Sequence, residues 1–372
     1  MISGENNLNH RSPKERKVEG IQILRGVAAL MVMLLHIWVL ELRFGNDAHV
    51  MPQFFRSGNC GVDLFFVISG FVMATISRGA FKNRSGIIRF VYNRVTRIYP
   101  VYWFYCLPAL FIFLVRPDLV NIAQGNKVDL LRSFLLLPQK IKPLLAVGWT
   151  LIHEMHFYTV MVLLLIFPER FFLRLLLLWA IIVTAANMII SDCIALPPLA
   201  WIALHPLSLE FIAGCFVARF TFAGVGRYRI PALWIGFALL FAAAIFYAYI
   251  FPSVIEAAEW PRVIMFGLPA TLIVYGSSSF NSIRTDHSLP RFMLLMGDAS
   301  YSLYLSHALV ATAVGMAWSL LGLGKILSNH FLVATMLITC LTTGILSYIF
   351  IEVPVMARSR ALYSALSRRD FL

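Results

Sequence analysis

The chain has 372 residues, of which 60% are hydrophobic and only 13% are charged, and its mean hydropathy is +0.79. A soluble domain carries about a quarter charged residues, so this composition excludes a water-exposed surface over most of the chain. The net charge of +13 would suggest nucleic-acid binding in a soluble protein. Here the basic residues lie in short segments between apolar runs, which indicates control of membrane topology, and no nucleic-acid partner is expected.

Apolar segments long enough to cross a bilayer, which takes about 20 residues, recur along the whole chain. The predicted spans are 22–42, 61–77, 98–116, 148–167, 171–190, 205–221, 231–250, 262–279, 299–321 and 331–352. Segment 117–147 differs from the other connections, because its apolar middle at 130–138 is too short to cross and predicts an interfacial or re-entrant helix. The sequence therefore predicts an all-α polytopic membrane protein, a bundle of about ten transmembrane helices.

Lys and Arg residues are distributed unequally between the two sides of this bundle. Segments on the side of the N-terminus hold 21 of them and the opposite segments hold 9, with Arg25 left inside the first span. Because basic residues are retained on the cytosolic side, both termini are predicted to be cytosolic. The expected organisation is a basic N-terminal segment at 1–20, one transmembrane domain at 21–355 and a short basic tail at 356–372.

Two ionisable residues, Arg25 and His36, lie inside the first predicted span. Eleven positions at 100° each place them on one helix face, about 16 Å apart along the axis. Arg25 is near the cytosolic entry, where it could either extend to the interface or act in a site. His36 lies in the outer half of the membrane, and an imidazole at that depth suits proton transfer.

The second predicted span carries Asp63 at a depth similar to that of His36, with Ser69 and Gly70 further along. A carboxylate at this depth could hold the imidazole in one tautomer. It could equally interact with the positive N-terminal end of its own helix. Ser69 and Gly70 are more simply explained by close approach of a neighbouring helix.

Arg94 and Arg97 precede the third predicted span and, being three residues apart, share a helix face. Two guanidinium groups so placed can bind phosphate oxygens. Contact with anionic lipid headgroups is the alternative explanation.

The fourth predicted span contains a run of polar and aromatic residues. Glu154 and Tyr158 fall on one side of the helix, and Trp149, His153 and His156 fall on the opposite side. A carboxylate in a span should face a polar cavity. The two histidines resemble half of a metal site, but no further ligand is apparent, and no metal site is predicted.

Near the end of the chain, Tyr301, Tyr304 and His307 open the ninth predicted span, where both packing and function remain possible explanations. Glu352 ends the tenth predicted span, and an interfacial role is sufficient to explain it.

Together these segments resemble the acyltransferase 3 family of membrane proteins, and within it the exopolysaccharide-production type of O-acetyltransferase. The resemblance covers about 20–354 and rests on Arg25 and His36 with ten residues between them, Gly61 to Gly70, the Arg94/Arg97 pair, Trp149 to Tyr158, and Ser300 to His307. It implies ten core helices and transfer of an acyl group, usually acetyl from acetyl-coenzyme A, to a carbohydrate hydroxyl. It also implies that the Arg25/His36 and Arg94/Arg97 pairs are functional. The chain departs from the common family pattern at His153 and His156, so inherited roles are not expected for those two.

The sequence and this resemblance together give an expected set of site residues. The expected catalytic residues are His36, Glu154 and Asp63, with Glu154 or Asp63 orienting the imidazole. The residues expected to bind acyl-coenzyme A are Arg25, Arg94 and Arg97. The residues expected to line the pocket are Ser69, Trp149, Tyr158, Tyr301 and His307.

The expected partners are acyl-coenzyme A as donor substrate, a carbohydrate acceptor and the lipid bilayer of a bacterial inner (plasma) membrane. No bound cofactor is expected. Two other functions would use the same features differently. A transporter or flippase of a glycan or lipid intermediate would use the polar residues as a path, and a scaffold of a polysaccharide-synthesis complex would need no intramembrane histidine.

Overall fold

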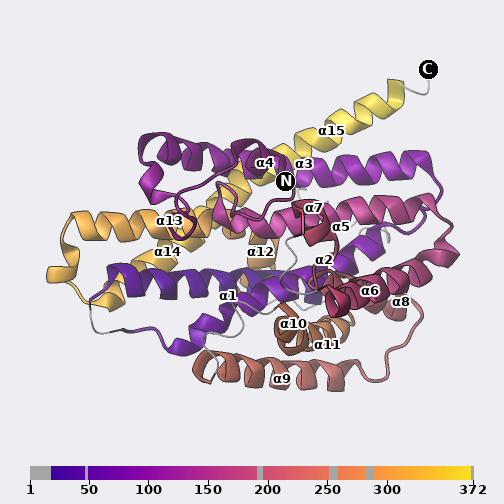
Figure 1. Ribbon diagram of the computed structural model, residues 1–372, viewed down its shortest axis with the longest axis horizontal. Coiled ribbons are helices and arrows are strands. Elements are labelled where there is room, and N and C mark those ends of the chain that lie inside the picture. Colours follow the sequence, from indigo (N-terminus) through magenta and orange to yellow (C-terminus); the bar gives the residue numbers. More distant parts are fainter. Residues whose placement is uncertain (1–17, 47–48, 191–195, 251–258, 281–287, 370–372) are drawn as a thin grey trace, which may run out of the picture.

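The computed structural model describes residues 18–46, 49–190, 196–250, 259–280 and 288–369. Every regular element in these ranges is helical, and most of the long helices run roughly parallel or antiparallel in one bundle (Figure 1). The α-helices are α1 (Glu19–Phe44), α2 (Cys60–Ile76), α3 (Arg84–Val115), α4 (Leu130–Leu135), α5 (Trp149–Ile166), α6 (Phe172–Ile189), α7 (Pro198–Ala203), α8 (Ser208–Phe222), α9 (Arg229–Tyr249), α10 (Glu259–Arg262), α11 (Leu268–Ser277), α12 (Ser288–Asp298), α13 (Ser300–Leu320), α14 (Asn329–Ser347) and α15 (Val353–Arg369).

Nine helical stretches of the described residues are long and apolar enough to cross a membrane. They are Glu19–Phe44, Gln53–Ile76, Arg84–Val115, Ala146–Ile166, Glu169–Ile189, Pro198–Phe222, Arg229–Tyr249, Ser300–Leu320 and Asn329–Leu366. Each corresponds to one predicted span. The remaining predicted span, 262–279, falls on α10, a π-helical turn and α11, which together are shorter and carry Arg262. The all-helical bundle is confirmed, while the count of ten and the orientation of the termini stay predictions.

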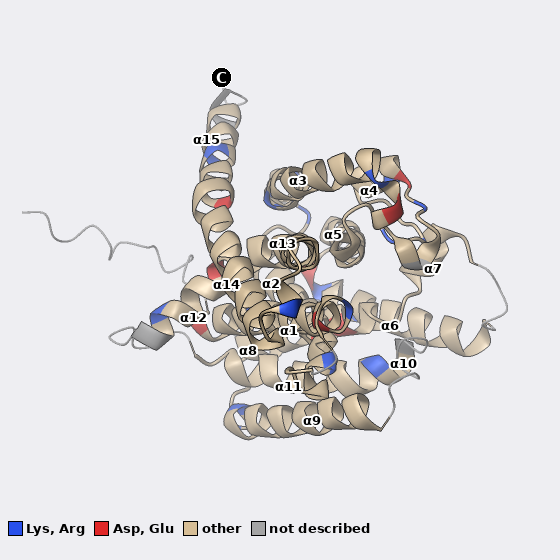
Figure 2. Cartoon of the chain, turned by 90° about the vertical axis from the view of Figure 1, so that its left-hand side faces the viewer, with Lys and Arg blue, Asp and Glu red and all other residues tan. Residues whose placement is uncertain are grey.

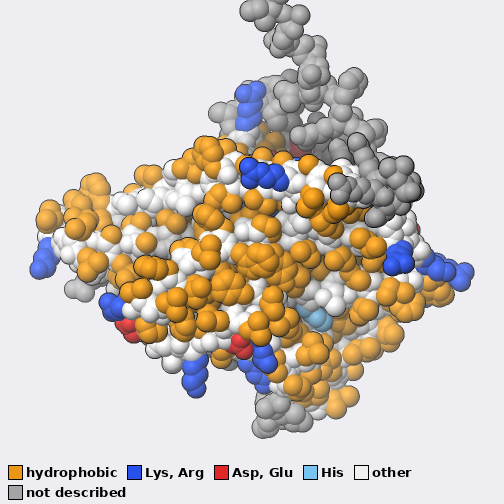
Figure 3. All heavy atoms as spheres, turned by 90° about the horizontal axis from the view of Figure 1, so that it is seen from above, with side chains coloured by type: hydrophobic (Ala, Val, Ile, Leu, Met, Phe, Trp, Pro, Cys, Tyr) orange, Lys and Arg blue, Asp and Glu red, His pale blue; other side chains and the backbone are white. Residues whose placement is uncertain are grey.

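Helix is the only regular structure in this bundle because a helix satisfies its own backbone hydrogen bonds where no water is available. The outer surface follows the same constraint. One side of the molecule is covered mainly by hydrophobic side chains, with most of the visible Lys and Arg towards its edges (Figure 3). Exposed apolar side chains also occur on several helices, for example Phe111 on α3, Ile181 on α6 and Phe241 on α9.

Two helices are longer than the sequence predicted. With 32 residues, α3 extends about 48 Å, well beyond the ~30 Å hydrocarbon core. The predicted span at 98–116 covers only its second part, so Arg94 and Arg97 lie within the helix rather than before it. Similarly, α14 continues through a π-helical turn at Tyr348–Glu352 into α15, which extends away from the bundle (Figure 2).

Segment 117–147 turns back into the bundle through α4. The Tyr102 hydroxyl donates to the Ser133 carbonyl oxygen at 2.7 Å, and Trp103 Nε1 donates to that of Phe134 at 2.9 Å. Both donors lie in the middle of α3, and Ser133 is buried. The segment therefore packs against α3, and whether it is interfacial or re-entrant stays a prediction.

Glycines bring α2 and α8 into direct backbone contact. A Cβ atom on Gly70 would lie 1.9 Å from the Phe211 carbonyl oxygen, and one on Gly214 would lie 2.0 Å from that of Val67. No side chain can occupy either position without separating the helices. The predicted close approach at Gly70 is therefore confirmed, and it fixes α2, which lines the pocket described below.

We expect Gly70→Ala and Gly214→Ala to destabilise the protein by about 3 kcal/mol, the upper part of the range for overpacked cores, since the clash is with backbone. The measurement is the thermal midpoint of detergent-purified protein. Gly226→Ala is the control, because the nearest atoms to a Cβ there are side-chain atoms at 3.4 Å or more. Equal midpoints for all three variants would contradict the role of the glycine contact.

Candidate active site

An elongated pocket runs between α1, α2, α3, α5 and α13. Along α2 its lining extends from Val62 to Met73, eleven residues apart, which corresponds to about 16 Å. The empty space inside it, with the open solvent at its mouth included, is about 820 Å³. The polar residues of its lining are Arg25, Ser69, Arg94, Arg97, Thr150, Glu154, Tyr158, Ser300, Tyr301 and Tyr304.

Seven of the eleven expected site residues line this pocket: Arg25, Ser69, Arg94, Arg97, Glu154, Tyr158 and Tyr301. They come from five helices, so the pocket exists only in the folded bundle. The other four, His36, Asp63, Trp149 and His307, lie outside its lining.

One end of the pocket is strongly basic. The Arg94 guanidinium lies over the Tyr158 ring at 5.9 Å, and that of Arg97 lies over Tyr301 at the same distance. In the described part of the chain, no hydrogen bond or ion pair joins Arg94 or Arg25 to a protein group, and Arg94 Nε is buried without a partner. These two guanidinium groups are available for an anion.

The third arginine, Arg97, is held by a carboxylate that the sequence analysis did not assign to the site. Glu352 lies 3.5 Å from Arg97, accepts a hydrogen bond from Ser302 at 2.7 Å, and is only 2% exposed. Glu352 therefore has partners inside the bundle in addition to the interfacial role that the sequence predicted, and its depth in the membrane stays a prediction. The apolar residues on either side of it in sequence, Ile351 and Val353, are the sequence feature that could have indicated the burial of Glu352.

Glu154 lies about midway along the pocket. It accepts hydrogen bonds from the Tyr158 hydroxyl, one turn further along α5, and from Ser69 of α2 at 3.3 Å. The expected placement of Glu154 and Tyr158 on one helix side is confirmed. These contacts leave Glu154 directed into the pocket rather than onto an imidazole.

His36 of α1 pairs with His307 of α13. Their rings are 4.8 Å apart, and His307 Nε2 lies 3.2 Å from His36 Nδ1. Each Nδ1 also contacts the carbonyl oxygen four residues earlier, at 2.8 Å for His36 and 3.1 Å for His307. A carbonyl oxygen only accepts, so these contacts favour the tautomers with the proton on Nδ1, in which the single His36 proton is shared between the Val32 carbonyl oxygen and His307 Nε2. The lone pair of His36 is thereby placed on Nε2.

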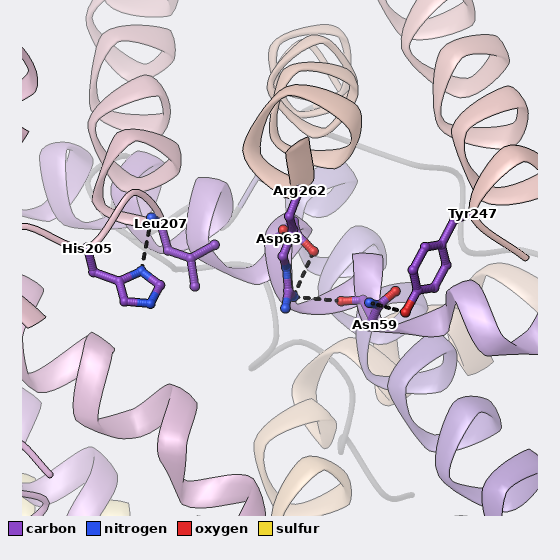
Figure 4. Close-up of polar contacts among 6 residues, drawn as sticks. All are labelled: Asn59, Asp63, His205, Leu207, Tyr247 and Arg262. Atoms are coloured by element: carbon purple, nitrogen blue, oxygen red, sulfur yellow. Dashed lines mark hydrogen bonds and ion pairs between the residues drawn. The ribbon is translucent and has the colours of Figure 1, made fainter. Parts of the chain in front are cut away.

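Asp63 does not orient this imidazole, which corrects the expectation from the sequence. Arg262 of α10 binds both of its carboxylate oxygens, with Nε at 2.8 Å and Nη2 at 3.0 Å, and also donates to the Asn59 carbonyl oxygen (Figure 4). Asp63 is completely buried, and a charged carboxylate in such a place requires a partner of this kind. The Asp63 carboxylate, which was expected to orient His36, is therefore bound to Arg262 instead.

Trp149 belongs to the surroundings of this ion pair rather than to the pocket. The Arg262 guanidinium lies over the Trp149 ring at 5.8 Å, and Glu210 of α8 lies beside Asp63. The rings of His153 and His205 lie nearby in a T-shaped contact, with centroids 4.4 Å apart. Within the described ranges, no three His, Cys, Asp or Glu side chains converge in a way that could hold a metal ion.

We expect removal of either partner of the buried pair, in Asp63→Asn or Arg262→Met, to destabilise the protein by about 3–5 kcal/mol, because one charge is left uncompensated. The double variant should be more stable than either single variant. Thermal midpoints measure both effects. Arg116→Gln is the control, since it breaks the exposed pair with Asp118 and should not change the midpoint.

Comparison with known proteins agrees with this arrangement. The family model described as an acyltransferase domain matches residues 18–351. The exopolysaccharide production protein ExoZ of Rhizobium meliloti (strain 1021) is 32% identical over 329 residues, 82% of this chain and 92% of that protein. The acyltransferase MdmB of Streptomyces mycarofaciens is 26% identical over 324 residues, 80% of each chain. No solved structure matches.

The family match covers most of the chain, including α1 with His36, the three arginines and the helices that line the pocket. The apolar helices and the basic pocket are those of an enzyme embedded in lipid. The chain therefore belongs to the acyltransferase 3 family and is a multi-pass membrane O-acyltransferase.

Proposed function

We propose that the protein transfers an acyl group, most simply acetyl, from cytosolic acyl-coenzyme A to a hydroxyl of an exported carbohydrate. The observation that carries this proposal is the elongated pocket, with three arginines along it and a histidine pair behind its far end. The proposed setting is the inner membrane of a bacterium, with the basic end of the pocket facing the cytosol.

The arginines suit the donor. Coenzyme A carries phosphates, and guanidinium groups bind phosphate oxygens through two parallel hydrogen bonds. Arg25 and Arg94 make no hydrogen bond or ion pair in the described part of the chain, so binding a phosphate would break no existing ion pair. The excess of basic residues on the side of Arg94 supports a cytosolic entrance, where coenzyme A is available.

The shape of the pocket suits the rest of the donor. Between its polar groups the pocket is lined by apolar side chains such as Val62, Phe66 and Met73. Its length along α2 would hold the extended pantetheine arm of coenzyme A. Glu154 lies along this path, where its carboxylate can accept hydrogen bonds from amide groups of the arm. The thioester would then lie near Thr150 and Tyr304, at the end closest to the histidine pair.

His36 is the proposed general base. Its Nε2 lone pair takes the proton of the acceptor hydroxyl, and the hydroxyl oxygen bonds to the thioester carbonyl carbon. The carbon–sulfur bond breaks, and the proton passes from His36 to the departing thiolate. The products are an ester and free coenzyme A, so no other reactant is needed.

The carbohydrate acceptor is supported by a relative. ExoZ is named for exopolysaccharide production, and it matches this chain over 92% of its own length. MdmB shares the acyltransferase description. We propose a polysaccharide or its lipid-linked repeat unit as the acceptor.

In the first test, purified protein is incubated with radiolabelled acetyl-coenzyme A and candidate glycans, and label on sugar is measured. We expect His36→Ala to lower the transfer rate by ~10²–10⁴-fold, the usual contribution of a general base. His330→Ala is the matched control, because His330 is exposed on α14. Near-normal turnover in His36→Ala would exclude the assignment, and glycan movement without labelling would favour a flippase.

The second test concerns the donor. We expect Arg94→Gln to raise KM for acetyl-coenzyme A by about 10- to 100-fold, the worth of a hydrogen bond to a charged group. KM for acetyl-pantetheine, which lacks the nucleotide, should change little. Arg174→Gln, an exposed position on α6 outside the pocket, is the control. An equal effect of Arg94→Gln on both donors would contradict phosphate binding.

A further inference from the structure

The end of the pocket nearest the histidines is closed by two hydroxyl groups. Tyr304 of α13 and Thr150 of α5 contact each other at 2.8 Å, and both lie within hydrogen-bonding distance of the Val147 carbonyl oxygen, at 3.2 and 3.1 Å. Each hydroxyl has one proton, so one of them donates to Val147 and the other donates to its neighbour. The three groups form a closed hydrogen-bonded set between two helices.

This set separates the pocket from the histidine pair. Tyr304 and Thr150 line the pocket, yet they are only 6% and 7% exposed. Away from the pocket, the Tyr304 ring lies 5.8 Å from the ring of His307, which is not part of the lining. His36 contacts His307 but does not line the pocket. Contacts therefore lead from the pocket to the proposed base through Tyr304 and then His307.

The carbonyl oxygen that accepts these hydrogen bonds belongs to Val147, at the end of segment 117–147. Val147 lies in the short 3-10 helix Ala146–Gly148, directly before α5. The same segment is tied to α4 through the Ser133 hydroxyl, which accepts from the Leu144 backbone at 3.0 Å. A change in this segment, which faces the predicted acceptor side, is thus transmitted to the hydroxyl pair.

A general base close to a thioester can also promote hydrolysis of that thioester. Water admitted to His36 can attack the acyl carbon, the carbon–sulfur bond breaks, and the thiolate takes the proton that His36 removed from water. The products are a carboxylate, coenzyme A and a proton, and the donor is consumed without transfer. An enzyme of this type therefore needs to keep base and thioester apart when no acceptor is bound.

We propose that Tyr304 and Thr150 are positioning residues that form a partition between the donor pocket and His36, and that the partition suppresses hydrolysis of the acyl donor in the absence of acceptor. This inference rests on the proposed function, because it takes the pocket as the donor site. It assigns a role to two hydroxyl groups whose hydrogen-bond partners, within the described part of the chain, are each other and the Val147 carbonyl oxygen.

The test measures two rates separately: release of labelled acetate without acceptor, and transfer of label to acceptor. Tyr304→Phe and Thr150→Val each remove one hydroxyl while keeping the shape of the side chain. We expect either to raise hydrolysis about tenfold, the factor that the loss of roughly one hydrogen bond gives to an opening equilibrium. Thr150→Ser retains the hydroxyl and should hydrolyse at the wild-type rate. Thr159→Val, an exposed position on α5, is the control.

A double variant tests whether the increased hydrolysis depends on His36. Adding His36→Ala to Tyr304→Phe should return hydrolysis to the wild-type level, because the attacking water then has no base. Unchanged hydrolysis in both Tyr304→Phe and Thr150→Val would overturn the partition. Equal loss of hydrolysis and transfer would also overturn it, since it would indicate direct help to the reaction. Absence of transfer by the wild-type protein would instead overturn the proposed function.

Discussion

The absence of water inside the bilayer is the constraint on which this structure depends. Each charged group inside the bundle needs a partner within the protein, and most have one. Asp63 is bound by Arg262, Glu352 by Arg97 and Ser302, and Glu154 by Tyr158 and Ser69. Of the three arginines that line the pocket, Arg25 and Arg94 make no hydrogen bond or ion pair within the described part of the chain. The arginines left without partners therefore mark the place where an anion is expected.

The same constraint explains why the helices could be predicted well. An apolar run of about 20 residues has few alternatives to a helix in lipid, so nine predicted spans match helices of the structure. The full lengths of α3 and of the continuous α14–α15 helix could not be predicted from the apolar runs. Their projecting parts are polar, and a hydropathy pattern does not distinguish a polar helix from a polar loop.

Prediction of the site followed a similar division. Helical periodicity placed Glu154 and Tyr158 together, and they are bonded within one helix. Periodicity carries no information about which helices become neighbours, so it could not pair His36 with His307 or Asp63 with Arg262. Asp63 was expected beside His36 because the two have similar depth. Depth alone does not give the angular position of a helix in a bundle, and that position decided the outcome.

The π-helical turn at Tyr348–Glu352 has a consequence for the end of the chain. A π turn contains one more residue than an α turn, so α15 is rotated by about 100° relative to an uninterrupted helix. In this register Ser359 of α15 faces Tyr92 of α3. The Tyr92 hydroxyl donates a hydrogen bond to the Ser359 carbonyl oxygen at 2.8 Å. One continuous rod thus faces α13 along its first part and α3 along its second. Deletion of a single residue from the turn would leave the sequence of α15 intact and aim the wrong side of it at α3.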